Sequence, residues 1–156
     1  MRELQVIGVR VEMPTNQPLV LLHESEGTRY LPIWIGAVEA TAIAFAQQGA
    51  ESARPLTHEL MRSIIEGLGD ELVEVRINSV EDSVFFATLA FSSGTIVDAR
   101  PSDSIALALR CGARIVCAED VLDEVGIPAT PDEDAQIEQF REFLDEVEPE
   151  DFEAKE

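Results

Sequence analysis

The sequence predicts a compact α+β domain with an antiparallel or mixed sheet, three main helices and an acidic C-terminal helix. β-rich stretches, some of them alternating apolar and polar residues, recur along the chain, as expected for strands. Between them lie segments with apolar residues at the i, i+4, i+7 spacing of a helix. A length of 156 residues suits one domain with its own core. We expect that domain in residues 1–130 and an acidic tail with one amphipathic helix in residues 131–156.

The strand pattern predicts an antiparallel meander followed by a hairpin. Pro32 lacks a backbone N–H, so its strand should lie at a sheet edge or start late. The stretch 84–91 is apolar on both faces and should be the central strand of its hairpin. The segments that we expect to be strands are 4–11, 19–22, 30–35, 73–77, 84–91, 95–98 and 115–117.

The helix pattern predicts one buried helix and two amphipathic ones. Residues 36–48 are apolar on nearly every face, so this helix should be buried or should pack against another subunit. A second helix should start with Thr57 as its N-cap and carry Leu60, Ile64 and Leu68 on one face. A third should run from about Asp103 to Cys111, and a short acidic one from Glu119 to Val125.

Composition and charge restrict the function. The chain has 11 Lys and Arg against 31 Asp and Glu, a formal net charge of −20, and half of that charge lies in residues 131–156. Nucleic-acid binders usually carry a basic footprint, which is missing, so any phosphate ligand would need a cation or a few placed arginines. We expect no membrane span and a cytoplasmic protein, because apolar runs are short and Cys111 and Cys117 are too few for a disulfide scaffold.

The richest polar segment is the strand-to-helix turn at 98–104. Asp98 and Asp103 would suit a hard cation such as Mg²⁺ or Mn²⁺, and Arg100 and Ser102 would suit a phosphate at a helix start. A structural role is also open, in which Asp103 or Ser102 caps the helix and Asp98 pairs with Arg100 or Arg54 to brace the turn. A similar Arg-Pro turn at Arg54 precedes the second helix.

Two further side chains are candidates for chemistry. Glu39 is the single acid within the otherwise apolar helix 36–48, and it either complements the helix dipole or joins the turn at 98–104 as a metal ligand. His58 lies in the first turn of the second helix and is either a solvated residue or a ligand and proton-transfer group. Sequence spacing leaves open whether Glu39, Asp98 and Asp103 meet.

Four segments, in this order and spacing, resemble the bifunctional nuclease (BFN) domain family. The resemblance covers roughly residues 4–128, and the tail lies outside it. The segments are Leu31-Pro32-Ile33-Trp34-Ile35-Gly36, Glu39-Ala40, Arg54-Pro55-Leu56-Thr57-His58-Glu59-Leu60-Met61, and the run from Asp98-Ala99-Arg100-Pro101-Ser102-Asp103 to Ala108.

The resemblance implies a self-associating α+β domain, a dimer among the options, with nuclease activity on DNA and RNA. The polar residues of the matching segments are then the candidate site: Glu39, His58, Asp98 and Asp103 as catalytic groups, Arg54, Arg100 and Ser102 as phosphate-binding groups, and Glu39, Asp98 and Asp103 as ligands of Mg²⁺ or Mn²⁺. The missing basic surface keeps a second hypothesis open. In it the protein is a non-enzymatic oligomeric module that binds an anionic ligand or a partner protein, and its acidic tail recruits others.

Overall fold

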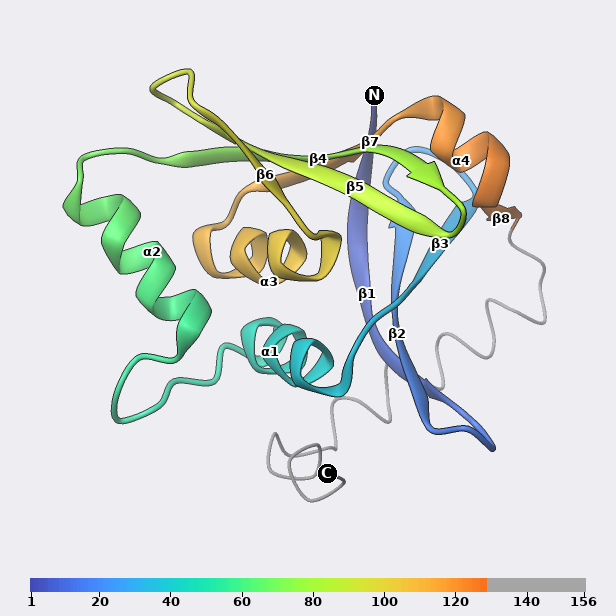
Figure 1. Ribbon diagram of the computed structural model, residues 1–156, viewed down its shortest axis with the longest axis horizontal. Coiled ribbons are helices and arrows are strands. Elements are labelled where there is room, and N and C mark those ends of the chain that lie inside the picture. Colours follow the sequence, from blue (N-terminus) through green and yellow to red (C-terminus); the bar gives the residue numbers. More distant parts are fainter. Residues whose placement is uncertain (129–156) are drawn as a thin grey trace.

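The computed structural model describes residues 1–128, which fold into eight strands and four helices (Figure 1). The predicted α+β class is confirmed, whereas the helix expected in the acidic tail lies outside the described residues. The elements are β1 (Arg2–Glu12), β2 (Gln17–Glu24), β3 (Arg29–Trp34), α1 (Ala37–Gln48), α2 (Thr57–Gly67), β4 (Leu72–Glu81), β5 (Val84–Phe91), β6 (Ile96–Ala99), α3 (Pro101–Cys111), β7 (Arg114–Cys117), α4 (Glu119–Val125) and β8 (Ile127–Pro128).

The strands form one mixed sheet in the order β6-β5-β4-β7-β1-β2-β3-β8. Strands β4 and β7 pair in parallel, and the other neighbours pair antiparallel. The predicted β1-β2-β3 meander is confirmed. Beyond β3 only the two-residue strand β8 follows, and it pairs with Arg29 and Tyr30. Strand β3 is therefore not the edge strand itself, but β8 does not reach Pro32, whose missing N–H needs no partner on that side.

Strands β4 and β5 form the predicted hairpin, and β5 lies between β4 and β6. Its turn is the pair Asp82-Ser83, with φ angles of 50° and 66°. Two successive positive φ angles belong to the tight turn whose twist matches that of paired strands. The sequence predicts a turn at Glu81-Asp82, and the structure places it one residue further along the chain.

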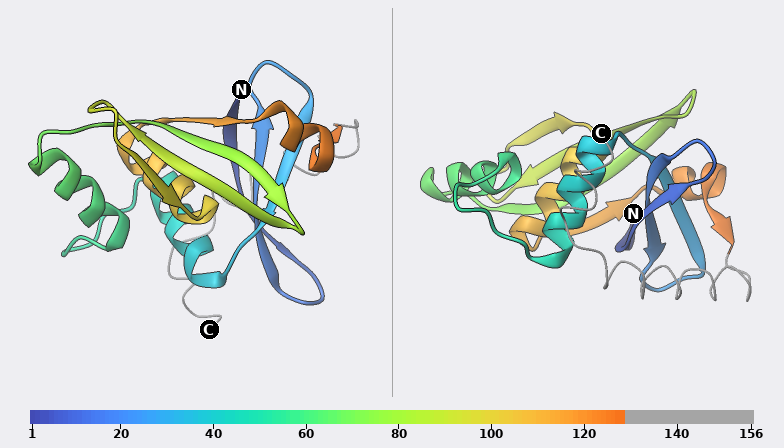
Figure 2. Two further views of the ribbon diagram at one scale, coloured as in Figure 1. Left: turned by 45° about the horizontal axis from the view of Figure 1, so that its top comes forward. Right: turned by 90° about the horizontal axis from the view of Figure 1, so that it is seen from below.

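Helices α1, α2 and α3 lie on one side of strands β4–β6 (Figures 1 and 2). Helix α3 packs on β4 and β5, and its Ile105 and Leu107 are fully buried. Helix α1 packs on α3, β1 and β2, and the face that it buries contains Ala40, Ile43 and Ala44. The expectation that α1 is buried holds only for this face, since Val38 on the same helix is 72% exposed.

Helix α2 differs from its expected packing. Its Met61 and Ile65 pack against the core, whereas the predicted stripe of Leu60, Ile64 and Leu68 is exposed. Helix ends also shift: Leu56, not Thr57, is the N-cap of α2, and α3 begins at Pro101, two residues before the expected start. Proline is well suited to a first helical position, because its missing N–H has no helical partner there.

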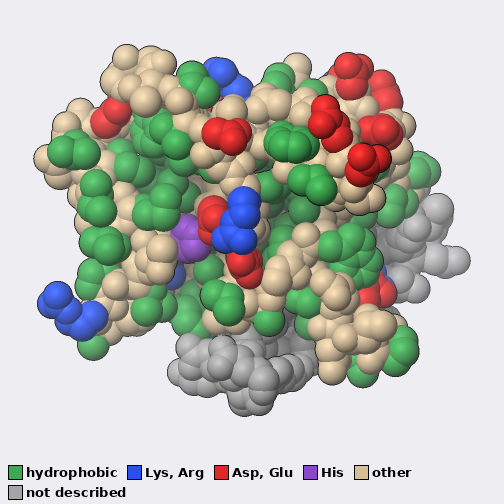
Figure 3. Space-filling model, in the orientation of Figure 1, with side chains coloured by type: hydrophobic (Ala, Val, Ile, Leu, Met, Phe, Trp, Pro, Cys, Tyr) green, Lys and Arg blue, Asp and Glu red, His purple; other side chains and the backbone are tan. Residues whose placement is uncertain are grey.

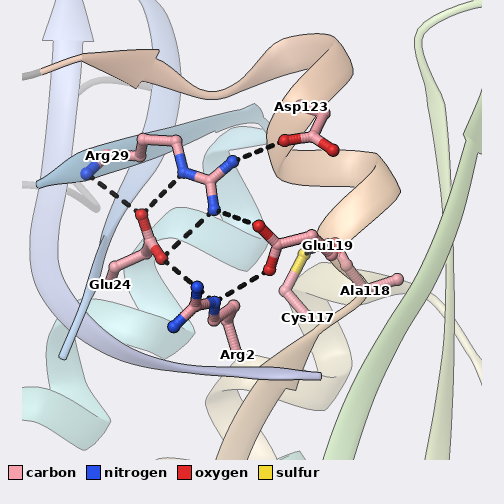
Figure 4. Close-up of polar contacts among 7 residues, drawn as sticks. All are labelled: Arg2, Glu24, Arg29, Cys117, Ala118, Glu119 and Asp123. Atoms are coloured by element: carbon pink, nitrogen blue, oxygen red, sulfur yellow. Dashed lines mark hydrogen bonds and ion pairs between the residues drawn. The ribbon is translucent and has the colours of Figure 1, made fainter. Parts of the chain in front are cut away.

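A network of ion pairs joins the first three strands to α4 (Figure 4). The Arg29 side chain donates to Glu24 Oε1 at 2.7 Å, to Glu119 Oε1 at 2.9 Å and to Asp123 Oδ1 at 2.8 Å. Arg2 adds a 2.8 Å hydrogen bond to Glu119. Glu24 is buried, and the hydrogen bond from Arg29 lowers its pKa. None of the described helices is both long and apolar enough to cross a membrane.

Candidate functional site

The first turns of α1, α2 and α3 meet at one pocket of about 400 Å³. These turns contribute Glu39, His58 and Asp103 to its lining, and Arg100 is the N-cap of α3. Free backbone N–H groups and the positive end of the dipole make a helix start favourable for anions. The helix pocket, as we call it, is therefore suited to an anionic ligand in spite of the chain's acidic composition.

Arg100 links the polar side chains of this pocket into one cluster. Its Nη1 donates to Glu39 Oε1 at 3.0 Å, and its Nε donates to Asp103 Oδ2 at 2.9 Å. On the far side of Asp103, Oδ1 lies 3.2 Å from His58 Nε2. Glu39, Arg100, Asp103 and His58 form what we call the Arg100 cluster. In Figure 3 acidic, basic and histidine side chains gather at the centre of this face.

The Arg100 guanidinium is both tightly paired and open to solvent. Hydrogen bonds to Asp103 and, next, to Glu39 raise its pKa above the usual arginine value, so it carries its charge at any physiological pH. Its side chain is nevertheless 64% exposed. A ligand that arrives from solvent can therefore reach the guanidinium without prior opening of the fold.

Local sequence explains how Glu39 and Arg100 are placed. Gly36 is the N-cap of α1, and a Cβ at this position would collide with the Glu39 carboxylate. The carboxylate can thus fold back over the helix start because residue 36 has no side chain. At α3, Pro101 fixes the first helical turn, and Ser104 Oγ donates to the Arg100 carbonyl at 2.7 Å.

A second hollow of about 400 Å³ adjoins the cluster on the side of the sheet. Glu39 and Arg100 line both hollows, so they stand between them. The β4-β5 hairpin tip, Trp34 and the buried Ser102 complete what we call the sheet-side hollow. The predicted phosphate-binding residue Ser102 therefore lies in the hollow next to the cluster and not in the helix pocket.

Two predicted site residues lie apart from the cluster. Asp98 pairs with Thr88 in the sheet and is exposed, whereas its neighbour Ala99 packs against the core on the side of the helices. Because side chains alternate along a strand, Asp98 points to the opposite face from α3. Arg54 is exposed in the connection between α1 and α2 and lines neither hollow.

The sequence analysis missed two parts of this site. Trp34 was noted only within a matching segment, and the Arg110–Glu59 ion pair at 3.5 Å, which lines the helix pocket, was not expected. The exposure of Trp34 depends on where β3 ends in the sheet, which spacing does not give. Glu59 and Arg110 are separated by 51 positions, so no local pattern joins them.

The side chains of the cluster can be compared with the ligands that the predicted Mg²⁺ or Mn²⁺ ion would need. Among residues 1–128 no three His, Cys, Asp or Glu side chains are grouped closely enough to hold a metal by themselves. Two carboxylates, Glu39 and Asp103, do flank one position, which the Arg100 guanidinium fills as a cation. Magnesium often uses only one or two carboxylates and completes its shell with water and substrate phosphate. An ion bound in that mode would have Glu39 and Asp103 as its carboxylate ligands, without Asp98, and would require Arg100 to move from between them.

Replacing Gly36 by alanine should disturb the Arg100 cluster and leave the fold intact. The backbone φ of −79° accepts alanine, so the melting temperature should change little, while the new Cβ displaces the Glu39 carboxylate from Arg100. A crystal structure of the variant should show the Glu39–Arg100 contact lengthened beyond hydrogen-bonding distance. Gly67→Ala is the matched control, since its Cβ meets nothing within 4 Å. An unchanged Glu39–Arg100 contact in Gly36→Ala would contradict this account.

Comparison with known proteins supports the resemblance. An uncharacterised protein of Mycobacterium tuberculosis is 52% identical over 163 residues, which span 99% of each chain. Bifunctional nuclease 2 of Oryza sativa is 28% identical over 67% of this chain and 34% of its own, and bifunctional nuclease 1 of Arabidopsis thaliana is 28% identical over 60% and 31%. The bifunctional nuclease domain model matches residues 20–130, which include the whole Arg100 cluster. The chain therefore belongs to the bifunctional nuclease domain family.

Proposed function

We propose that this protein is a nuclease that hydrolyses phosphodiester bonds of DNA and RNA at the Arg100 cluster, with a divalent cation. The observation that carries the proposal is an exposed guanidinium held between two carboxylates, with an imidazole beside them, where three helices start. Family membership and the plant relatives, which are named bifunctional nucleases, support the same activity.

Arg100 binds and orients the phosphate in this proposal. Its fork of N–H donors matches two phosphate oxygens, and the rigid start of α3 fixes its position. A phosphate that binds there competes with Glu39 and Asp103 for the guanidinium, which frees these carboxylates for a cation. Glu39 and Asp103 would hold a Mg²⁺ or Mn²⁺ ion, which would supply Lewis-acid stabilisation of the charge that develops on the phosphate.

His58 takes a proton from the water that attacks the phosphorus atom and returns it to the oxygen that leaves as the P–O bond breaks. Its Nε2 lies 3.2 Å from Asp103 Oδ1, so the carboxylate orients the ring within the pocket. An imidazole has two ring nitrogens, so it can accept a proton at one and donate a proton from the other. Arg54 and Asp98 have no role in this scheme, because neither lines the helix pocket.

The overall charge makes the cation a requirement of the proposal. Residues 1–128 contain nine arginines, no lysine and 19 acidic residues, so the described part of the chain repels nucleic acid at long range. A divalent ion and three helix starts provide positive potential only at the site. Nucleic acid should therefore bind weakly without the divalent ion, and in its presence it should bind at the Arg100 cluster.

Cleavage assays test the proposal directly. Purified protein should cut labelled DNA and RNA in Mg²⁺ or Mn²⁺ and stop when the ion is chelated. Asp103→Asn should lower the rate by about 100-fold or more, since it removes a cation ligand and the partner of His58. Asp120→Asn, an exposed acid of α4, is the matched control and should cleave normally. Equal activity in Asp103→Asn and the parent chain would place the activity in a contaminant or at another site.

The Asp98→Asn variant distinguishes a metal site that includes Asp98 from one that does not. A three-carboxylate site built from Glu39, Asp98 and Asp103 requires loss of cleavage in this variant. The arrangement in the structure requires cleavage to persist, because Asp98 lies on the other face of the sheet.

One observation favours a second function, a non-enzymatic oligomeric module. The exposed stripe of Leu60, Ile64 and Leu68 on α2 is an apolar surface suited to a second copy, as in a dimer. In this alternative the cytoplasmic protein holds an anion at the Arg100 cluster, and the acidic tail binds a partner protein. Light scattering gives the oligomeric state, and titration of labelled DNA and RNA at low salt, with and without Mg²⁺, separates the two functions. Absence of binding in both conditions favours the module.

A further inference from the structure

The sheet-side hollow contains an aromatic side chain that the proposed hydrolysis does not use. Trp34 is the last residue of β3, and it is 55% exposed, although its neighbours Ile33 and Ile35 are buried. Large aromatic side chains are usually mostly buried, so an exposed tryptophan that lines a hollow is informative. Trp34 is also the single tryptophan of the chain.

The surroundings of Trp34 combine an apolar wall with a charged end. The β4-β5 hairpin tip contributes Ser83, Val84 and Phe85 to the lining. Arg100 and Glu39 lie at the end shared with the helix pocket. The volume of about 400 Å³ falls within the range of sites that hold small ligands. A ligand that fits both ends has a flat apolar part and an anionic part.

We propose that the sheet-side hollow is a subsite for an unpaired nucleobase, which stacks on Trp34 while its own phosphate contacts Arg100. This inference rests on the proposed nuclease function and narrows its substrate to single-stranded DNA or RNA, or to unpaired ends. Every base has a π-face, so stacking on one aromatic ring tolerates different sequences. In a duplex the two faces of each base are covered by its neighbours, which leaves no face for Trp34.

The charges in the hollow favour a nucleotide over a second protein copy as its occupant. A protein that covered Trp34 would also cover Arg100 and Glu39 and remove them from water at a cost in free energy. A nucleotide brings a phosphate that replaces the carboxylate contacts of the guanidinium. The base then needs only the apolar end of the hollow.

Fluorescence of Trp34 tests the subsite without any cleavage. Adenosine monophosphate in Mg²⁺ should quench the emission in a saturable way, whereas ribose 5-phosphate, which has the same phosphate and no base, should not. Leu68→Ala, an exposed apolar substitution outside both hollows, should leave the quenching unchanged. Equal quenching by the two compounds, or none by either, overturns the subsite.

Variants of Trp34 extend the test to the substrate. By calorimetry, Trp34→Leu should weaken binding of adenosine monophosphate by about 5- to 100-fold, and Trp34→Phe, which keeps a stacking ring, should lose much less. In cleavage assays Trp34→Leu should raise KM for a single-stranded oligonucleotide with little change in kcat, and it should reduce the preference over the matched duplex. If Trp34→Leu does not fold, the quenching experiment on the parent protein decides alone.

The outcomes separate this inference from the proposed function. Base-dependent quenching without cleavage supports the subsite and counts against the nuclease. Cleavage with no quenching, and with Trp34→Leu equal to the parent chain, overturns the subsite and leaves the nuclease in place. A change of oligomeric state in Trp34→Leu with unchanged nucleotide affinity also overturns it and assigns Trp34 to a protein interface.

Discussion

Replacing Arg100 by alanine is expected to lower the rate of nucleic-acid cleavage by about 100- to 1,000-fold, while the fold stays intact. The variant loses the donors that orient the phosphate and leaves Glu39 and Asp103 without the cation between them. Because the guanidinium is 64% exposed, its ion pairs contribute little to stability, and the melting temperature should change by only a few degrees. Cleavage kinetics and thermal unfolding on the same samples measure both effects.

The Arg100→Lys variant distinguishes the contribution of the positive charge to the cleavage rate from that of the planar guanidinium. Lysine keeps the positive charge but offers a point charge in place of a planar fork, so it should restore part of the lost rate and not all of it. Full activity in Arg100→Lys would show that only charge matters at this position. Full activity in Arg100→Ala would show that Arg100 merely braces the two carboxylates, and the proposed phosphate contact would be wrong.

Local sequence patterns predicted most of the fold. Strand alternation and the apolar stretch 84–91 depend on the pleat of the sheet and on burial, and these are set by nearby residues. The wrong predictions concern features that depend on tertiary packing, such as which face of a helix is buried. In α2 the stripe of Leu60, Ile64 and Leu68 has the spacing of a buried face, yet Met61 and Ile65 are the side chains that meet the core.

The candidate site was predictable only in part. Glu39, His58, Arg100 and Asp103 could be selected because each stands at a helix start, where polar side chains have a chemical use. Their assembly depends on three helices that start at one place, and no spacing encodes that. Asp98 shows the limit most clearly. It lies within β6 on the sheet face opposite α3, whereas Arg100, two residues later, lies beyond the end of the strand as the N-cap of α3. The buried Glu24 network joins residues as far as 117 positions apart.

Replacing Arg29 by methionine should destabilise the protein more than loss of any exposed ion pair, with a fall in melting temperature of roughly 10 °C. The side chain of Glu24 is only 5% exposed, and without Arg29 its nearest remaining cation is Arg2, at 3.7 Å. A buried carboxylate left with a weak partner lowers the free energy of unfolding much more than the loss of a solvent-exposed ion pair does. Arg62→Met, which removes an exposed pair with Glu66, is the matched control and should shift the melting temperature by at most a few degrees.

The pH dependence of the Arg29 effect identifies Glu24 as its cause. The native pKa of Glu24 is held below 4.5, mainly by the hydrogen bond from Arg29, so the network stabilises the fold above that pH. The stabilisation is lost as the pH falls from 4.5 through the lower native pKa, where Glu24 takes up a proton. Melting curves of the parent chain and Arg29→Met should therefore differ most near neutral pH and converge in acid. Adding Glu24→Gln to Arg29→Met should recover part of the loss at neutral pH, because a neutral amide is cheaper to bury. A constant difference at all pH values would show that Arg29 acts through packing and not through Glu24.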